Sequence, residues 1–307
     1  MTVIRPYQAG DEVGIRQLFS LVFQSEMPLP LWRWKYLREG YSPPVFVAEE
    51  DGQIICHYGA IQQSLGWQGQ KHKAWDVVDI MVHPQKQGRG LFRQTVQAFM
   101  RECCEGQGLF LYGFPTERHK RLGELLVGYE PVAQVYRVHR TVSAPATCPA
   151  EVVTDVLPLN WDAHWQRLEQ RFDLSTRRDH AYLTWRYLAR PDRRYRFVTI
   201  PAAPALAVVA LRPENVALME FLVDREDPAL ARLLAAGVEG IAREAGMSEI
   251  EGWFPPFSWE KNFLCGAGGY SGGESNHWLE CRLFDQRLAA AWLAEHFFYS
   301  LGDFDVY

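Results

Sequence analysis

The segment "HPQKQGRGLFRQ" (residues 83–94) joins an expected strand to an expected helix. Before it, "DVVDIMV" (76–82) is apolar and rich in β-branched residues, which is typical of a buried strand. After it, apolar residues recur on one face at helical spacing: Phe92, Val96, Phe99, Met100 and Cys103. The segment is therefore expected to lead into the N-terminus of a helix.

The composition of this loop indicates an anion site. A helix N-terminus offers unpaired backbone N–H groups and the positive end of the helix dipole. Gly88 and Gly90 would let an anionic ligand approach the main chain, and Lys86 and Arg89 add positive charge. The loop matches neither the nucleotide P-loop nor the GxGxxG fingerprint, so the pattern favours a phosphate or pyrophosphate of another kind. The alternative is a tight turn that binds nothing.

The overall composition narrows the class of protein. The chain has 307 residues, 48% hydrophobic and 22% charged, with a formal net charge of −5. A negative net charge argues against nucleic acid as a partner, because phosphate neutralisation needs a basic surface. The longest apolar stretch (201–211) is too short to cross a bilayer, and the N-terminus lacks a signal-peptide core. We therefore expect no membrane partner and a cytoplasmic location.

The six cysteines form no CxxC pair, and Cys103 and Cys104 are adjacent. This spacing suits a zinc site poorly, so we expect reduced thiols and no metal cofactor.

The chain repeats one plan. "WKYL" (34–37) recurs as "WRYL" (185–188), and each copy is followed by two strand-like runs, a buried strand, a long helix and a further strand. Landmarks that recur in one order favour duplication over chance. We expect two α/β domains, at 1–145 and 151–307, joined by the Ala- and Pro-rich stretch 143–151.

The motif Q-x-x-G-x-G at 85–90 resembles the pyrophosphate-binding motif of the GNAT acetyltransferase superfamily. The opening (3–19) resembles the first strand and helix of that family, and 109–132 resembles its later strand, helix and Gly-aromatic exit. The resemblance implies an α/β (α+β) fold of two tandem GNAT-like domains. Each would have a mixed, mostly antiparallel central sheet flanked by helices, and the second copy would be degenerate.

The resemblance also implies a site for acetyl-CoA as co-substrate. Main chain at Met81 and Val82 would hold the pantetheine and the thioester, and Thr116 would contact the cofactor arm. The pyrophosphate would be bound by six consecutive residues: Gln87, Gly88, Arg89, Gly90, Leu91 and Phe92.

Attack of an amine on a thioester needs a proton acceptor and a donor for the departing thiolate. Asp76 lies six residues before Val82, where some relatives carry a glutamate base, and Asp79 interrupts an apolar run. A buried carboxylate is costly without a partner, so Asp79 should serve a ligand or pair with a cation. A regular strand would direct the two aspartates to opposite faces, and a bulge would change this. Either could instead be purely structural.

The general acid is harder to assign. Many relatives carry a tyrosine four residues before the exit glycine, where this chain has Glu124. Tyr112, Tyr129 or a water could substitute, although both tyrosines also fit the core. Single histidines such as His57 are weak candidates.

The second half lacks the loop. Its equivalent stretch (224–230) contains no glycine and three acids, which would repel a phosphate. The glycine-rich run 265–276 is expected to be a flexible loop. The aromatic C-terminus suggests two alternatives: 302–307 either closes the second domain's core or folds back to hold an ammonium at the first domain's cleft.

The leading hypothesis is an acetyl-CoA-dependent N-acetyltransferase acting on a small amine, an amino sugar or a protein amine. The alternatives are a non-catalytic acyl-CoA-binding module and, more weakly, an aminoacyl-transfer enzyme. The acceptor and the oligomeric state are left open by the sequence.

Overall fold

The chain forms two compact units. A computed structural model describes residues 1–142 and 149–305. Unit 1 comprises 1–64, 72–132 and 279–290, and the described remainder of the chain forms unit 2. Each unit thus takes segments from both halves of the sequence. The division of the chain into domains at 1–145 and 151–307 remains a prediction. Residues 143–148 lie outside the described part.

Unit 1 is built on a mixed sheet. Its strands, in spatial order, are β1 (Thr2–Pro6), β2 (Val45–Glu50), β3 (Gln53–Trp67), β4 (Gln70–Val82), β5 (Phe110–Gly113) and the end of β13 (Ser271–Leu283). β1 to β3 are antiparallel, β4 runs parallel to β5, and β5 is antiparallel to β13. Asp51 and Gly52 both have positive φ at the turn between β2 and β3, which is typical of a tight hairpin turn.

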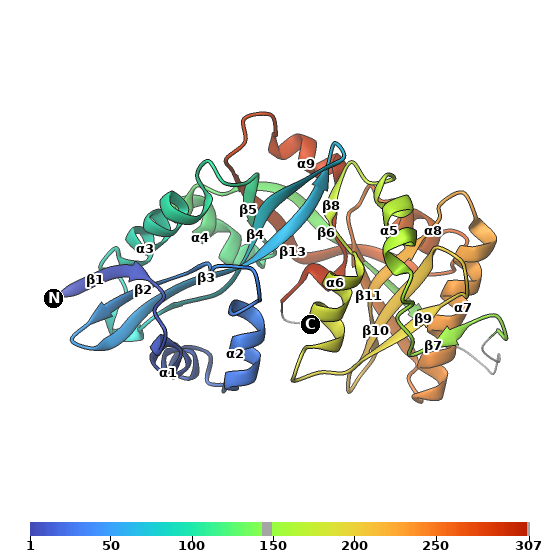
Figure 1. The fold of residues 1–307 in the computed structure, drawn as a ribbon, viewed down its shortest axis with the longest axis horizontal. Coiled ribbons are helices and arrows are strands. Elements are labelled where there is room, and N and C mark those ends of the chain that lie inside the picture. The colour runs from blue at the N-terminus through green and yellow to red at the C-terminus, as the bar shows by residue number, and fades with distance from the viewer. Residues whose placement is uncertain (143–148, 306–307) are drawn as a thin grey trace. The chain divides into compact units, whose positions relative to one another are not determined.

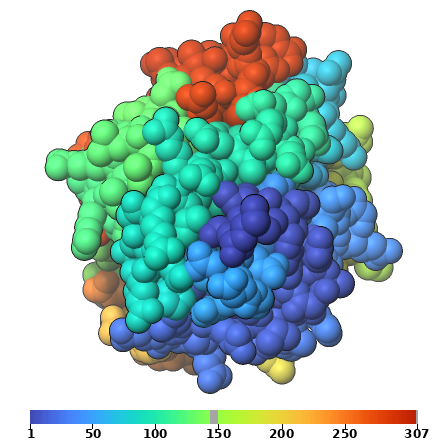
Figure 2. Space-filling view, turned by 90° about the vertical axis from the view of Figure 1, so that its left-hand side faces the viewer, coloured from blue at the N-terminus to red at the C-terminus, as the bar shows by residue number. Residues whose placement is uncertain are grey.

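Helices cover both faces of this sheet (Figure 1). α1 (Asp11–Phe23) and α2 (Leu29–Tyr36) lie on one side, and α3 (Leu91–Phe99) and α4 (Glu117–Val127) lie on the other. α3 packs against β1 and β2, so that in the space-filling view its teal surface adjoins the dark blue N-terminal strand (Figure 2). The core beneath α3 and α4 is aromatic: Phe46, Tyr58, Trp75, Phe99 and Tyr129.

In unit 2 the strands follow the spatial order β6, β12, β11, β10, β9 and β7. Their bounds are β6 (Glu130–Thr141), β12 (Glu249–Phe254), β11 (Val216–Val223), β10 (Ala205–Leu211), β9 (Tyr195–Thr199) and β7 (Val153–Thr154). β11 runs parallel to β12, and its other neighbour, β10, is antiparallel to it. In addition, β8 (Leu174–Thr176) pairs with β14 (Phe297–Phe298) and with Leu65–Trp67 of β3.

The helices of unit 2 are α5 (Trp161–Glu169), α6 (His180–Leu183), α7 (Pro228–Glu244), α8 (Trp259–Cys265) and most of α9 (Ala290–His296). α7 is the long helix predicted after β11, and nine of its residues are buried. The mostly antiparallel sheets flanked by helices confirm the predicted fold class.

The prediction of a flexible loop over 265–276 is wrong for its second part, because β13 begins at Ser271. Glycine allows this strand to lie close to its neighbour: a Cβ on Gly272 would come within 2.6 Å of the Arg137 carbonyl oxygen and of the Tyr136 ring. The Gln134 side chain also donates to the Ser275 carbonyl at 2.6 Å. The glycines here permit close strand packing rather than mobility.

The C-terminal segment closes the core of unit 2. Arg186 donates to the carbonyl oxygens of Gly302 (2.9 Å) and Phe304 (2.7 Å). Asp303 is 3% exposed and is ion-paired with Arg178, so it does not face an ammonium ligand. The packing alternative is therefore confirmed for 302–305, and the cleft alternative is wrong for these residues. Residues 306–307 lie outside the described part.

Candidate functional site

The glycine loop forms the N-terminus of α3 as predicted. Gly88 and Gly90 have φ of +78° and +74°, and α3 begins at Leu91. A Cβ on Gly88 would meet nothing within 4 Å, and residues 87–90 are exposed. The loop therefore presents main chain that a ligand can approach, with a backbone conformation that favours glycine.

The positive charge of this loop is smaller than predicted. Lys86 forms an ion pair with Glu50, and Arg89 lies 3.6 Å from the same carboxylate. The hydrogen bond from Lys86 is the main cause of the lowered pKa of Glu50. One acid thus offsets half of the charge, while the Arg89 side chain remains 55% exposed and can reach a ligand.

The predicted thioester region lies where β4 and β5 part. Their register joins Trp75 to Leu111 and Asp76 to Tyr112, after which β4 continues to Val82 and β5 ends at Gly113. Met81 is buried and Val82 half-buried at the end of β4. Thr116 directly precedes α4, and its hydroxyl lies 3.1 Å from His119 Nδ1.

Asp79 is held by two side chains of α2. Lys35 Nζ lies 3.1 and 2.9 Å from its two carboxylate oxygens, and the Tyr36 hydroxyl donates to Oδ2 at 2.6 Å. Asp79 has φ +50°, so the regular alternation of β4 does not extend through it. The expectation that a buried Asp79 would pair with a cation is confirmed, and the cation is Lys35.

These contacts decide the charge of Asp79. Burial alone would raise the pKa of Asp79, but the charge of Lys35 and the hydrogen bonds from Tyr36 and Lys35 outweigh it, and the pKa is lowered. Asp79 is therefore an ionised carboxylate whose oxygens are already occupied. Such a group holds a position well and accepts a proton poorly near neutral pH.

His57 completes this group, and sequence reasoning undervalued it. Its Nδ1 donates to the Asp79 carbonyl oxygen at 2.7 Å, and its buried Nε2 has no hydrogen-bond partner among the described residues. Burial lowers the pKa of His57, so the ring is neutral and Nε2 carries a free lone pair. Gly59 is required here, because a Cβ would come within 2.7 Å of His57 and 2.9 Å of Tyr36.

The other predicted proton-transfer residues are more dispersed. Asp76 is buried on β4 beside Tyr112. Glu124 is partly exposed on α4, 3.7 Å from Lys120. The hydroxyls of Tyr129 and Tyr58 are hydrogen-bonded to each other at 2.6 Å, and burial raises the pKa of both. Tyr129 is thus engaged in the core rather than free to protonate a thiolate.

The equivalent helix start in unit 2 is occupied by its own side chain. Asp227 caps α7 by accepting from the Leu230 N–H at 2.9 Å, and Pro228 removes another donor. Asp224 pairs with Arg171 at 2.7 Å. This arrangement supports the prediction that the second copy has no phosphate site there.

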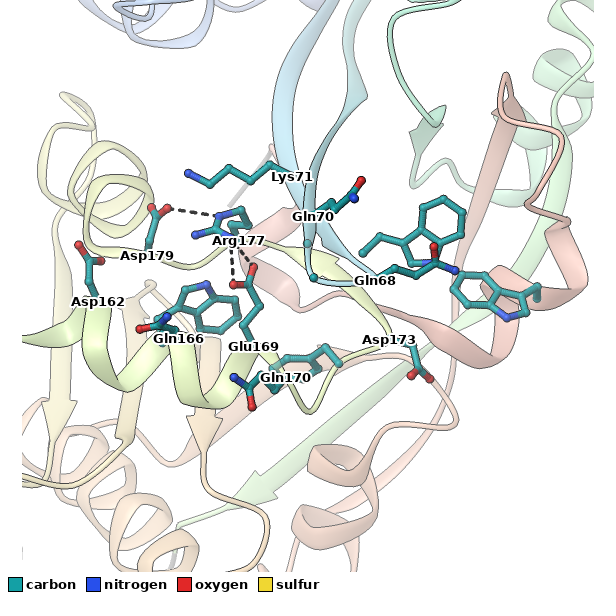
Figure 3. Close-up of a pocket in the computed structure, with 16 residues that line it drawn as sticks. Gln68, Gln70, Lys71, Asp162, Gln166, Glu169, Gln170, Asp173, Arg177 and Asp179 are labelled. Carbon is teal, nitrogen blue, oxygen red and sulfur yellow. Dashed lines mark hydrogen bonds and ion pairs between the residues drawn. The ribbon is translucent and has the colours of Figure 1, made fainter.

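Unit 2 contains a separate open pocket between the β3–β4 turn, α5 and β8 (Figure 3). Arg177 pairs with Glu169 at 2.9 Å and lies 3.6 Å from Asp179, and Asp173 pairs with His296 at 2.7 Å. Its charged groups largely satisfy one another, and none of the predicted site residues lines it.

Two further observations bear on the class of site. Among residues 1–142 and 149–305, no group of three His, Cys, Asp or Glu side chains is placed to hold a metal ion. Within the same residues, no helix has the length and apolar character that spanning a membrane requires.

Known proteins are similar to this chain in fold more than in sequence. Residues 3–121 match the family model described as acetyltransferase (GNAT) domain, whereas no curated protein matches the chain significantly. A GCN5-related N-acetyltransferase from Anabaena variabilis is similar with a TM-score of 0.68 and 12% identity, covering 93% of this chain and 73% of that one.

Two other solved structures are similar over a comparable extent. A probable N-acyltransferase from Enterococcus faecalis has a TM-score of 0.66 and 10% identity, covering 96% of this chain and 74% of that one. Saccharomyces cerevisiae N-myristoyltransferase with bound myristoyl-CoA has a TM-score of 0.60 and 12% identity, covering 92% and 80%. Residues 3–121 therefore match a GNAT acetyltransferase domain, and the solved structures show that the chain as a whole is similar in fold to N-acetyltransferases and N-acyltransferases.

Proposed function

We propose that the protein is an acyl-CoA-dependent N-acyltransferase that moves an acetyl group from acetyl-CoA to a primary amine. The observation that carries this proposal is the exposed glycine loop at the start of α3, together with the parting of β4 and β5. The acceptor is a small amine, an amino sugar or a protein amine, and the reaction takes place in the cytoplasm.

In this proposal the main chain of 87–92 binds the pyrophosphate of CoA at the N-terminus of α3. Arg89 supports the negative charge, because its side chain is exposed and is only loosely held by Glu50. The acyl arm runs toward Met81 and Val82, and Thr116 contacts it from the start of α4. The myristoyl-CoA bound by the yeast N-myristoyltransferase supports an acyl-CoA ligand for this fold.

The amine attacks the thioester carbonyl directly, and the protein supplies the proton acceptor. Asp76 and Asp79 are the predicted acceptors. Asp79 is already paired with Lys35 and Tyr36, so it is suited to orienting neighbouring side chains rather than to taking up a proton. The available lone pair next to Asp79 is that of His57 Nε2. We therefore assign proton removal to the Asp79–His57 group, in which Asp79 is the ionised carboxylate. Asp76 is the alternative acceptor.

The test is thiol release from acetyl-CoA against amines, amino sugars and peptides, combined with calorimetry. One CoA site per chain is expected, and Gly88→Glu should abolish it by placing a carboxylate in the loop. Gly246→Glu is the matched control, because Gly246 also has positive φ (+68°), no atom within 4 Å of a Cβ, and lies in unit 2. Equal CoA affinity in both folded variants would refute the assignment of the loop.

The second candidate is a module that binds acyl-CoA without catalysis. It is favoured by Glu124, which stands where the resemblance leads us to expect a tyrosine. This candidate predicts CoA binding that depends on Gly88, without amine-dependent thiol release.

A further inference from the structure

Glu280 is a carboxyl group that the C-terminal half of the chain contributes to unit 1. It lies on β13, directly opposite Gly113 in the antiparallel register with β5. Gly113 is the last residue of β5, and the pairing of β5 with β4 has ended just before it. Opposite residues of an antiparallel pair project to the same face, and Gly113 leaves that position open for the Glu280 side chain.

The Glu280 carboxyl group packs against α4. A Cβ on Gly123 would lie 2.7 Å from Oε1 and 3.1 Å from Oε2, so only glycine permits this contact. The next residue of α4 is Glu124, where the resemblance leads us to expect a tyrosine that acts as general acid. The Glu280 carboxyl group therefore lies against the turn of α4 that lacks the expected tyrosine.

The surroundings of Glu280 favour its protonated form. It is 4% exposed, and its buried Oε2 has no hydrogen-bond partner among the described residues. Burial first, and then the negative charge of Glu124, raise the pKa of Glu280 to about 8, while Lys120 acts in the opposite direction. Its charge also acts on Tyr58, Tyr129 and Cys281, and burial keeps all three in their neutral, protonated forms.

We propose that Glu280 is the general acid of the transferase reaction and protonates the sulfur of departing CoA. This assignment rests on the proposed function. As the amine nitrogen forms its bond to the acyl carbon, the carbon–sulfur bond breaks and its electron pair stays on sulfur. Glu280 transfers its carboxyl proton to that sulfur, which gives CoA thiol and a Glu280 carboxylate. The proton that the amine loses is returned to Glu280 through solvent, so the cycle is balanced.

The assignment gives the second half of the chain a part in the chemistry. The degenerate copy binds no phosphate at its own helix start, yet its strand β13 completes unit 1 at the level where β4 and β5 part. The first half alone would lack both this strand and the proton donor.

Glu280→Gln tests the proposal, because it keeps the shape of the side chain and removes the proton. With acetyl-CoA and an accepted amine, we expect kcat to fall by about 10²-fold, with the affinity for CoA unchanged. The alkaline limb of the wild-type pH–rate profile should disappear. Glu124→Gln should move that limb to lower pH, because it removes a neighbouring negative charge. Glu117→Gln, an exposed carboxylate on the same helix, is the control and should change neither.

Difference infrared spectroscopy adds a readout that does not depend on turnover. The band of a protonated carboxyl should be present in the wild type, absent in Glu280→Gln, and perturbed by CoA but not by desulfo-CoA. A wild type without amine-dependent thiol release would refute the proposed function, and the infrared result would still decide whether Glu280 meets the sulfur. An active Glu280→Gln with an unchanged pH profile, or a band that CoA leaves unaltered, would overturn the assignment of Glu280.

Discussion

Replacing Glu280 by glutamine should change how the stability of the protein depends on pH. The folded chain holds the proton of Glu280 up to about pH 8, whereas the unfolded chain loses it near the ordinary value of 4.5. Between these values the folded state binds more protons than the unfolded state. The free energy of unfolding therefore falls as pH rises through this window.

The size of the effect follows from the shift. At about 1.4 kcal/mol per pKa unit, the change from 4.5 to about 8 corresponds to about 5 kcal/mol across the window. The glutamine variant cannot ionise, so it should lack this contribution. Near pH 5 its unfolding free energy should lie within about 1 kcal/mol of the wild type, as for a near-isosteric change. Near pH 9 it should be the more stable protein by about 3–5 kcal/mol.

Urea unfolding followed by tryptophan fluorescence measures this, since the chain contains 11 tryptophans. The two proteins should be compared at several values between pH 5 and 9. Glu124→Gln is the useful third protein, because loss of its charge should lower the pKa of Glu280 and narrow the window. Parallel stability curves for wild type and Glu280→Gln would refute the reasoning, since they would show that Glu280 ionises normally in the folded chain.

Three further outcomes are expected. Glu50→Gln should tighten CoA binding by about 2–10-fold and steepen its salt dependence, because Lys86 is released to the loop; unchanged calorimetric affinity would contradict this. Either Asp79→Asn or Asp76→Asn, whichever changes the aspartate that assists deprotonation, should lower turnover by about 10²–10⁴-fold and leave CoA affinity unchanged. Near-normal rates in both variants would exclude this role. Arg178→Met should lower the free energy of unfolding by about 3–5 kcal/mol, because two buried carboxylates lose their partner; an unaltered melting temperature would show otherwise.

The sequence was sufficient for features that depend on neighbouring residues. The glycine loop, the hairpin turn at Asp51 and the long helix after β11 each follow from local chemistry or periodicity, and the structure has them in place. The sequence indicated that Asp79 could pair with a cation, because burial of an unpaired carboxylate is costly. It did not indicate that this cation would be Lys35.

Features that depend on distant pairing could not be predicted. No local pattern indicates that β13 would pair with β5, or that its glutamate would pack against a glycine of α4. Glu50 offsets the charge of Lys86 across 36 residues of sequence, and no local pattern indicates this pairing. His57 could have been singled out as a histidine within an apolar strand, but its free Nε2 depends on a carbonyl on the next strand.

Because the two halves of the chain share one plan, a variant of Asp79 alone does not separate a catalytic role from a structural one. In unit 1, Tyr36 donates to Asp79 at 2.6 Å, and in unit 2, Tyr187 of the repeated "WRYL" donates to Glu220 at 2.8 Å. Glu220 lies on β11, which follows the hairpin of its half as β4 does in the first.

A tyrosine–carboxylate pair is thus also present in the half whose equivalent stretch, 224–230, contains no glycine, which indicates that the pair supports the fold in both halves. What distinguishes unit 1 is the open loop and His57 Nε2, which has no hydrogen-bond partner among residues 1–142 and 149–305. Loss of activity in Asp79→Asn would therefore not identify a base by itself. Comparison with Glu220→Gln separates the two roles, because that change disturbs the equivalent pair without touching the site. Only a rate loss in Asp79→Asn that exceeds the loss in an equally destabilised Glu220→Gln would assign chemistry to Asp79.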